Sequence, residues 1–193
     1  MGGPVSIVIY SSTPRVGGNS DILADAALEG VRAADSGGEA FKVSIGRLSI
    51  APCTACESCM SSVETECTIH DDAIVPLRRL RSADAVLFAS PIYTFTVSAQ
   101  LKLLLDRAYS LFATDRWDTL AGLRVGAVFT YGDEDRDTSG VRNAISTVED
   151  MTRFWGATLV GVVEASCSAR REVLANEAAI EAARDLGRRL VTA

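Results

Sequence analysis

The chain has 193 residues, of which 48% are hydrophobic, and a formal net charge of −6. This length and apolar content allow one full hydrophobic core and exclude extended disorder. The negative charge argues against nucleic-acid and anionic-membrane binding, and no apolar run is long enough to span a bilayer. Residues 1–4 carry no leader signal, so we expect a cytoplasmic protein whose thiols stay reduced.

Five near-continuous apolar runs predict β-strands that are buried on both faces, at residues 5–10, 39–45, 85–89, 125–130 and 157–164. Helical patterns follow them at residues 20–34, 73–81, 98–111, 139–154 and 172–191, with Ser20, Asp72 and Ser98 as expected N-caps. Strands that alternate with helices predict right-handed crossovers and a parallel sheet. We therefore expect a single α/β domain over residues 1–193, a doubly wound three-layer sandwich around a five-stranded sheet.

The loop at residues 11–20 follows the first predicted strand directly and leads into a helical pattern. Free N–H groups in a first helical turn, together with the helix dipole, favour an anion. Four hydroxyls, the Asn19 amide and the Arg15 guanidinium suit a phosphate, and Gly17 and Gly18 let the backbone close around it. An ordinary βα turn rich in helix caps is the alternative interpretation of the same residues.

Two further strands also end in polar or aromatic residues, at 90–96 and at 130–133. In an open parallel sheet, ligands bind beyond the carboxyl ends of the strands, at the point where the strand order reverses. A flat aromatic ligand with a phosphate tail suits this arrangement. Its tail would lie on the first loop and its ring against the third and fourth strands.

Four of the five cysteines, Cys53, Cys56, Cys59 and Cys67, lie in an insertion at about residues 48–72 that is too long for a routine connection. Their spacing, C-x2-C-x2-C-x7-C, suits the four thiolate ligands of a [4Fe–4S] cluster. Zinc is a second possibility, and reduced thiols or a labile disulfide in a structural loop are a third. We expect the remaining cysteine, Cys167, to be a buried structural residue.

Three stretches together resemble the flavodoxin-like NAD(P)H-dependent FMN reductases, and within them the iron–sulfur flavoprotein group. They are the loop at 12–20, the segment at 90–107 that contains Ser90-Pro91-Ile92-Tyr93, and the cysteine segment at 52–72. The resemblance implies sheet order 2-1-3-4-5 and noncovalently bound FMN. Ser12 and Thr13 replace the family's glycine and serine, and Thr68 follows the last cysteine of the cluster motif where bacterial ferredoxins have proline.

By this resemblance, the FMN phosphate contacts Thr13, Arg15, Asn19 and Ser20, with backbone contributed by Ser12 and Gly18. The isoalloxazine ring would lie against Pro91, Ile92, Tyr93 and Thr94, and Thr130, Tyr131 and Gly132 would complete the pocket. In iron–sulfur flavoproteins, a cysteine motif of this type holds a [4Fe–4S] cluster that exchanges single electrons with FMN.

We therefore expect an FMN-dependent oxidoreductase. It would pass electrons between NAD(P)H as co-substrate, or an iron–sulfur cluster, and a quinone-like or other small acceptor or a redox protein. No side chain need act as an acid or base, because hydride transfer to a flavin depends on stacking geometry. The resemblance also implies a homodimer or homotetramer. An electron-transfer flavoprotein without its own substrate and a cysteine-based redox sensor stay open as alternatives.

Overall fold

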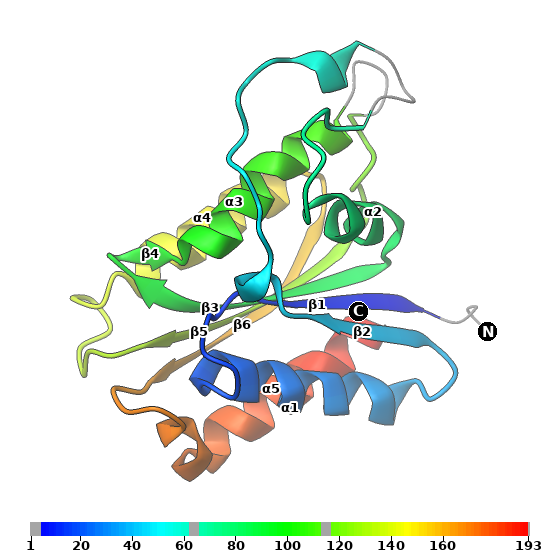
Figure 1. Ribbon diagram of the computed structural model, residues 1–193. Helices are drawn as coiled ribbons and strands as arrows, with labels where there is room; N and C mark the ends of the chain where they lie inside the picture. Colours follow the sequence, from blue (N-terminus) through cyan, green and yellow to red (C-terminus); the bar gives the residue numbers. More distant parts are fainter. Residues whose placement is uncertain (1–4, 62–65, 113–116, 193) are drawn as a thin grey trace.

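The computed structural model describes residues 5–61, 66–112 and 117–192, and its centre is a twisted sheet (Figure 1). Five parallel strands lie in the order β2-β1-β3-β5-β6, which counted along the chain is the expected 2-1-3-4-5. Their bounds are β1 Ser6–Ser11, β2 Glu39–Val43, β3 Ala85–Tyr93, β5 Arg124–Tyr131 and β6 Thr158–Ser166. The doubly wound fold is therefore confirmed.

The sheet also has one strand beyond the five parallel strands that were expected. A two-residue strand, β4 (Thr96–Val97), pairs antiparallel with the end of β3. Two residues are too few to produce a periodic hydrophobic pattern, so no sequence pattern predicts this strand. Its pairing also extends β3 to Tyr93, beyond the predicted end at residue 89.

Helices cover both faces of the sheet (Figure 1). α1 (Asn19–Ala34) and α5 (Glu177–Thr192) lie on one face, and α2 (Ile74–Ser82), α3 (Ala99–Arg107) and α4 (Val141–Phe154) lie on the other. Successive strand residues point to opposite faces. In β3, Phe88 therefore packs in the core beneath α3 and α4, and Leu87 packs in the core beneath α1 and α5.

α1 and α5 approach each other unusually closely. A Cβ at Gly30 of α1 would collide with the carbonyl of Arg184, and one at Gly187 of α5 would collide with the carbonyl of Ala27. Because α1 begins in the loop after β1, this contact also fixes the helix that forms one wall of the cavity described below. Within the described ranges, no helix is both long and apolar enough to cross a membrane.

Two of the expected helix caps are wrong. Gly18 is the N-cap of α1, so Ser20 lies inside the helix, and the Asp71 carboxylate, rather than that of Asp72, accepts from the Ala73 N–H before α2. The predicted Ser98 cap is confirmed, because its hydroxyl accepts from the Leu101 N–H. Residues 98–111 and 172–191 each form a 3-10 turn and an α-helix rather than one continuous helix.

The predicted insertion at 48–72 leaves the sheet after β2 and extends past the end of α3 (Figure 1). Its two limbs are joined at the base, where Asp72 accepts from the Ser49 N–H and Asp71 accepts from the Ala51 N–H, each at 2.8 Å. Residues 62–65 of the insertion, and residues 1–4 on which the leader prediction depended, lie outside the described residues.

Candidate functional site

A cavity of about 250 Å³ lies at the carboxyl edge of the sheet, where the chain order reverses between β1 and β3. It brings together eleven residues that the sequence predicted: Thr13, Arg15, Gly18, Asn19, Ser20, Pro91, Ile92, Tyr93, Thr130, Tyr131 and Gly132. Three separate strand ends contribute them, as expected for parallel strands that finish at one edge. Two predicted residues, Ser12 and Thr94, do not line this cavity.

The loop after β1 is shaped by the Asp21 carboxylate in the first turn of α1. One carboxylate oxygen accepts from the Ser11 hydroxyl at 2.7 Å, and the other accepts from the Gly17 N–H at 2.9 Å. Lys42 of β2 lies 3.1 Å away and is shared between Asp21 and Asp25. Burial raises the pKa of Asp21, but these partners outweigh it and hold the pKa below its usual range.

Gly17 makes the tight turn possible, because its φ of +64° lies in the left-handed region. The next amide, that of Gly18, donates to the Arg15 carbonyl at 2.9 Å, and the Arg15 amide donates to the Thr13 hydroxyl at 3.2 Å. The Arg15 side chain remains exposed at the mouth of the cavity. The loop is thus preformed, with one cation free to meet an anion.

Ser12 is buried and joins the loop to β3. Its N–H and its hydroxyl both donate to the Ala89 carbonyl, at 2.9 and 3.0 Å, and the hydroxyl accepts from Ser98 at 2.9 Å. The side chain therefore has no free donor to offer a ligand. The Ser12 backbone N–H, which was expected to contribute to the phosphate loop, is likewise engaged by Ala89.

Two predicted phosphate ligands already have partners. The Asn19 amide donates to the Ala169 carbonyl at 2.9 Å and accepts from the Val173 N–H at 3.3 Å, so it joins α1 to the segment after β6. The Ser20 and Thr130 hydroxyls lie 2.6 Å apart. Because that pair holds two protons and uses one between them, the second is available to an anion in the cavity.

The segment after β6 forms a wall that the sequence did not predict. Cys167, Ser168 and Arg170 line the cavity, and Arg170 donates to the Val16 carbonyl at 2.9 Å, which brings a second guanidinium beside the loop. Burial, with a smaller contribution from Glu172, raises the pKa of the Cys167 thiol to about 11. Cys167 is therefore a neutral buried thiol, as expected. No sequence signal placed the end of β6 against α1.

The predicted ring-binding wall ends in a strained hairpin between β3 and β4. Its two turn residues, Thr94 and Phe95, have φ values of +45° and +66°, a conformation usually taken by Asn or Gly. The Asn143 side chain of α4 donates to the Phe95 carbonyl at 3.0 Å and holds the turn in place. Backbone strain of this kind costs about 1–3 kcal/mol for each residue and clusters at functional sites.

The four cysteines of the insertion line a second cavity, of about 270 Å³, together with Arg107 and Tyr109. All four are free thiols, with Cys53 and Cys56 exposed and Cys59 and Cys67 half-buried. Hydrogen bonds from Ser58 and Thr68 lower the pKa of Cys56 to about 6. In the part of the chain that the structure describes, no three Cys, His, Asp or Glu side chains converge in metal-binding geometry. The donor chemistry fits a thiolate-bound centre, but the thiols are not gathered around a point.

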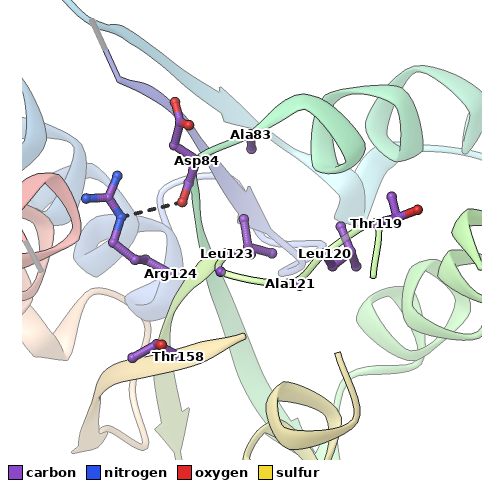
Figure 2. Close-up of a pocket in the computed structure, with 9 residues that line it drawn as sticks. Ala83, Asp84, Thr119, Leu120, Ala121, Leu123, Arg124 and Thr158 are labelled. Atoms are coloured by element: carbon purple, nitrogen blue, oxygen red, sulfur yellow. Dashed lines mark hydrogen bonds between the residues drawn. The ribbon is translucent and has the colours of Figure 1, made fainter. Parts of the chain in front are cut away.

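A larger cavity, of about 400 Å³, lies at the opposite, amino-terminal edge of the sheet (Figure 2). It is lined by residues at the starts of strands, among them Asp84, Arg124 and Thr158. Arg124 donates to the Asp84 carbonyl, as Figure 2 shows, and to the carbonyl of Val191 at 2.9 Å. Arg124, a cation that lines this amino-edge cavity, is therefore already bonded to backbone carbonyls of the fold. Ligands of open parallel sheets bind at the other edge, so the carboxyl-edge cavity is the candidate site.

A sheet of this order, with a phosphate-type loop after β1 and a cavity at the switch point, defines a flavodoxin-like mononucleotide-binding class of protein. Residues 5–167 match the family described as NADPH-dependent FMN reductase, and the chain belongs to this family. It is therefore an oxidoreductase of the FMN-dependent class.

The chain is similar to iron–sulfur flavoproteins of two archaea. It is 28% identical to the protein of Methanocaldococcus jannaschii over 195 residues, which cover 96% of this chain and 95% of that protein. It is 32% identical to the protein of Methanosarcina thermophila over 157 residues, which cover 81% of this chain and 78% of that protein. These relatives confirm the resemblance to the iron–sulfur flavoprotein group.

Among solved structures, the NAD(P)H:quinone oxidoreductase of Methanothermobacter marburgensis superposes with a TM-score of 0.75. The match covers 99% of both chains at 16% sequence identity. At this level of identity the likeness concerns the fold alone.

Proposed function

We propose that FMN occupies the carboxyl-edge cavity and that the protein transfers electrons from NAD(P)H to a small quinone-like acceptor. The observation that carries this proposal is the convergence of residues from the 11–20 loop and from the ends of β3 and β5 on one cavity at the switch point. The flavin supplies hydride and single-electron chemistry when bound. The chain binds it, orients it and limits access of water.

The phosphate group would lie on the preformed loop. Arg15 and Arg170 supply positive charge from two sides, and the hydroxyl pair of Ser20 and Thr130 supplies one free donor. The N-terminal turn of α1 adds unpaired N–H groups and the positive end of the helix dipole. The ring would lie against residues 91–93 and the edge formed by Tyr131 and Gly132.

We further propose that Cys53, Cys56, Cys59 and Cys67 bind a [4Fe–4S] cluster. All four face one cavity, and four thiolates are the donor set of such clusters. The bound cluster supplies one-electron exchange with a redox partner. We also propose a homodimer or homotetramer that functions in the cytoplasm.

An anaerobic purification tests both sites together. We expect one FMN per chain by absorbance, together with iron and inorganic sulfide in equal amounts and no zinc. Addition of NADH or NADPH with a soluble naphthoquinone should bleach and then regenerate the flavin band. Protein that stays colourless in excess FMN would overturn the flavin proposal, and zinc in place of iron would overturn the cluster proposal.

A further inference from the structure

One buried cation joins the two limbs of the insertion at residues 48–72, which carries the four cysteines. Arg107, the last residue of α3, has a side chain that is 0% exposed. Its Nη1 donates to the Ala51 carbonyl at 3.1 Å and to the Asp71 carboxylate at 2.8 Å, and its Nη2 donates to the Ile69 carbonyl at 2.9 Å. Ala51 precedes Cys53 and Ile69 follows Cys67, so Arg107 bonds to the backbone on both sides of the four thiols.

One donor of this guanidinium has no partner. Among the described residues, only three buried side-chain polar atoms lack a hydrogen bond, and Arg107 Nε is one of them. Buried N–H groups of charged side chains are rarely left unpaired, because the missing bond is costly. An unpaired donor of this kind needs an explanation.

The surroundings of Arg107 identify the missing acceptor. Arg107 lines the cavity of the four thiols, whereas its counter-ion Asp71 does not. Burial lowers the pKa of Arg107, but Asp71 and the nearby Cys67 sulfur outweigh it, so the pKa lies above its usual range. The guanidinium is therefore a permanent cation that faces the thiols, and its negative partner Asp71 lies outside the thiol cavity.

We propose that Arg107 sets the reduction potential of the cluster by donating from Nε to a cluster or Cys67 sulfur and by placing a buried positive charge against it. The inference rests on the proposed cluster. One-electron reduction adds one negative charge to the cluster and its thiolates, and a fixed cation favours that reduced form. The charge is little screened, because the guanidinium is removed from water.

Removing the positive charge of Arg107 and removing the negative charge of its partner Asp71 should shift the reduction potential of the cluster in opposite directions. The measurement is an anaerobic dithionite titration with mediators, in which the reduced cluster is followed by electron paramagnetic resonance. In Arg107→Gln we expect the reduction equilibrium to fall about tenfold, which for one electron is about 59 mV more negative. In Asp71→Asn, which keeps one accepting oxygen, we expect a severalfold rise. Arg107→Lys keeps the charge and should stay nearer wild type than Arg107→Gln.

The matched control is Lys102→Gln, which removes a cation from the same helix. Lys102 is 55% exposed and paired with Asp106. It does not line the cavity of all four thiols, although it lines a neighbouring open cavity with Cys53. Because water and Asp106 screen its charge, we expect a much smaller shift than in Arg107→Gln. If Arg107→Gln fails to assemble a cluster, Asp71→Asn still decides: a potential more positive than that of wild type supports the inference, and an unchanged or more negative potential overturns it.

Potentials that move in the same direction in Arg107→Gln and Asp71→Asn, or that do not move, would show Arg107 to be a structural clamp only and overturn the inference. The failure of the underlying proposal looks different: wild-type protein would then hold neither iron nor sulfide.

Discussion

The loop at residues 11–21 and the cysteine segment at residues 48–72 both follow strands at the carboxyl edge of the sheet, but they reach their shapes differently. The loop is largely buried and bonded to itself through Asp21 and Ser12. The cysteine segment is largely exposed, with its limbs joined at the base and by Arg107. The first region is organised for a ligand before the ligand arrives. The second has the donor atoms but lacks the convergence that a bound centre would impose.

Helix α3 connects the two regions. Its N-cap, Ser98, bonds to Ser12 of the loop, and its last residue, Arg107, reaches the thiol cavity. At 1.5 Å per residue, the nine-residue helix spans about 14 Å. The two candidate centres thus lie near opposite ends of one rigid element. Variants can therefore be chosen to affect one region and not the other.

The largest effect is expected from Cys56→Ser. Replacing one of four thiolate donors should abolish the cluster while the flavin stays bound, because the carboxyl-edge cavity contains none of these residues. Iron and sulfide assays with an absorbance spectrum measure this. Ser61→Ala, an exposed change in the same segment, should retain wild-type iron. Full iron content in Cys56→Ser would remove Cys56 from the ligand set.

Arg15→Ala should weaken FMN binding by roughly 10- to 100-fold, since hydrogen bonds to charged groups contribute about 1.5–3 kcal/mol. The dissociation constant from flavin fluorescence quenching measures the change. Arg32→Ala, which removes an exposed cation from the far end of α1, is the matched control and should bind normally. Equal affinity in wild type and Arg15→Ala would refute the phosphate assignment.

Asp21→Asn should destabilise the fold by about 1–3 kcal/mol, because the Gly17 and Ser11 donors lose a charged acceptor. The pKa of Asp21 lies below its ordinary value of 3.8. An unfolded Asp21 therefore binds a proton at higher pH than the folded one, and the stabilisation is present above pH ~4 and lost as pH falls through the folded pKa. Urea unfolding from pH 3 to 7 should show a shallower decline for Asp21→Asn than for wild type.

The smallest effect is expected from Arg124→Gln at the amino edge. Its hydrogen bonds to Asp84 and Val191 belong to the fold, so we expect a stability loss of about 1 kcal/mol with unchanged FMN affinity and turnover. A loss of FMN affinity here would move the functional site to the cavity in Figure 2.

The sequence predicted the fold and most of the candidate site, because both depend on local patterns. Buried parallel strands are visible in the sequence as apolar runs, and the polar residues at the end of each strand follow its apolar run directly. Since parallel strands finish at one edge, the strand order implied by the family resemblance was enough to gather Arg15, Pro91 and Tyr131 around one cavity. The Ser98 cap was predictable for the same local reason.

Tertiary structure alone decided the contacts between segments that are distant in the chain. Asn19 donates to the Ala169 carbonyl and Arg170 donates to the Val16 carbonyl, each across about 150 residues of chain. Ser20 leaves the expected cap position to pair with Thr130, and Arg107 reaches both limbs of the cysteine segment. No periodicity encodes such pairs, because each is a hydrogen bond between single side chains and distant backbone or hydroxyl groups. The positions of the strands and the chemistry of their ends came from the residues themselves, and the order of the strands came from the family resemblance that those residues carry. The partner of each polar group depended on the packing of helices against the sheet.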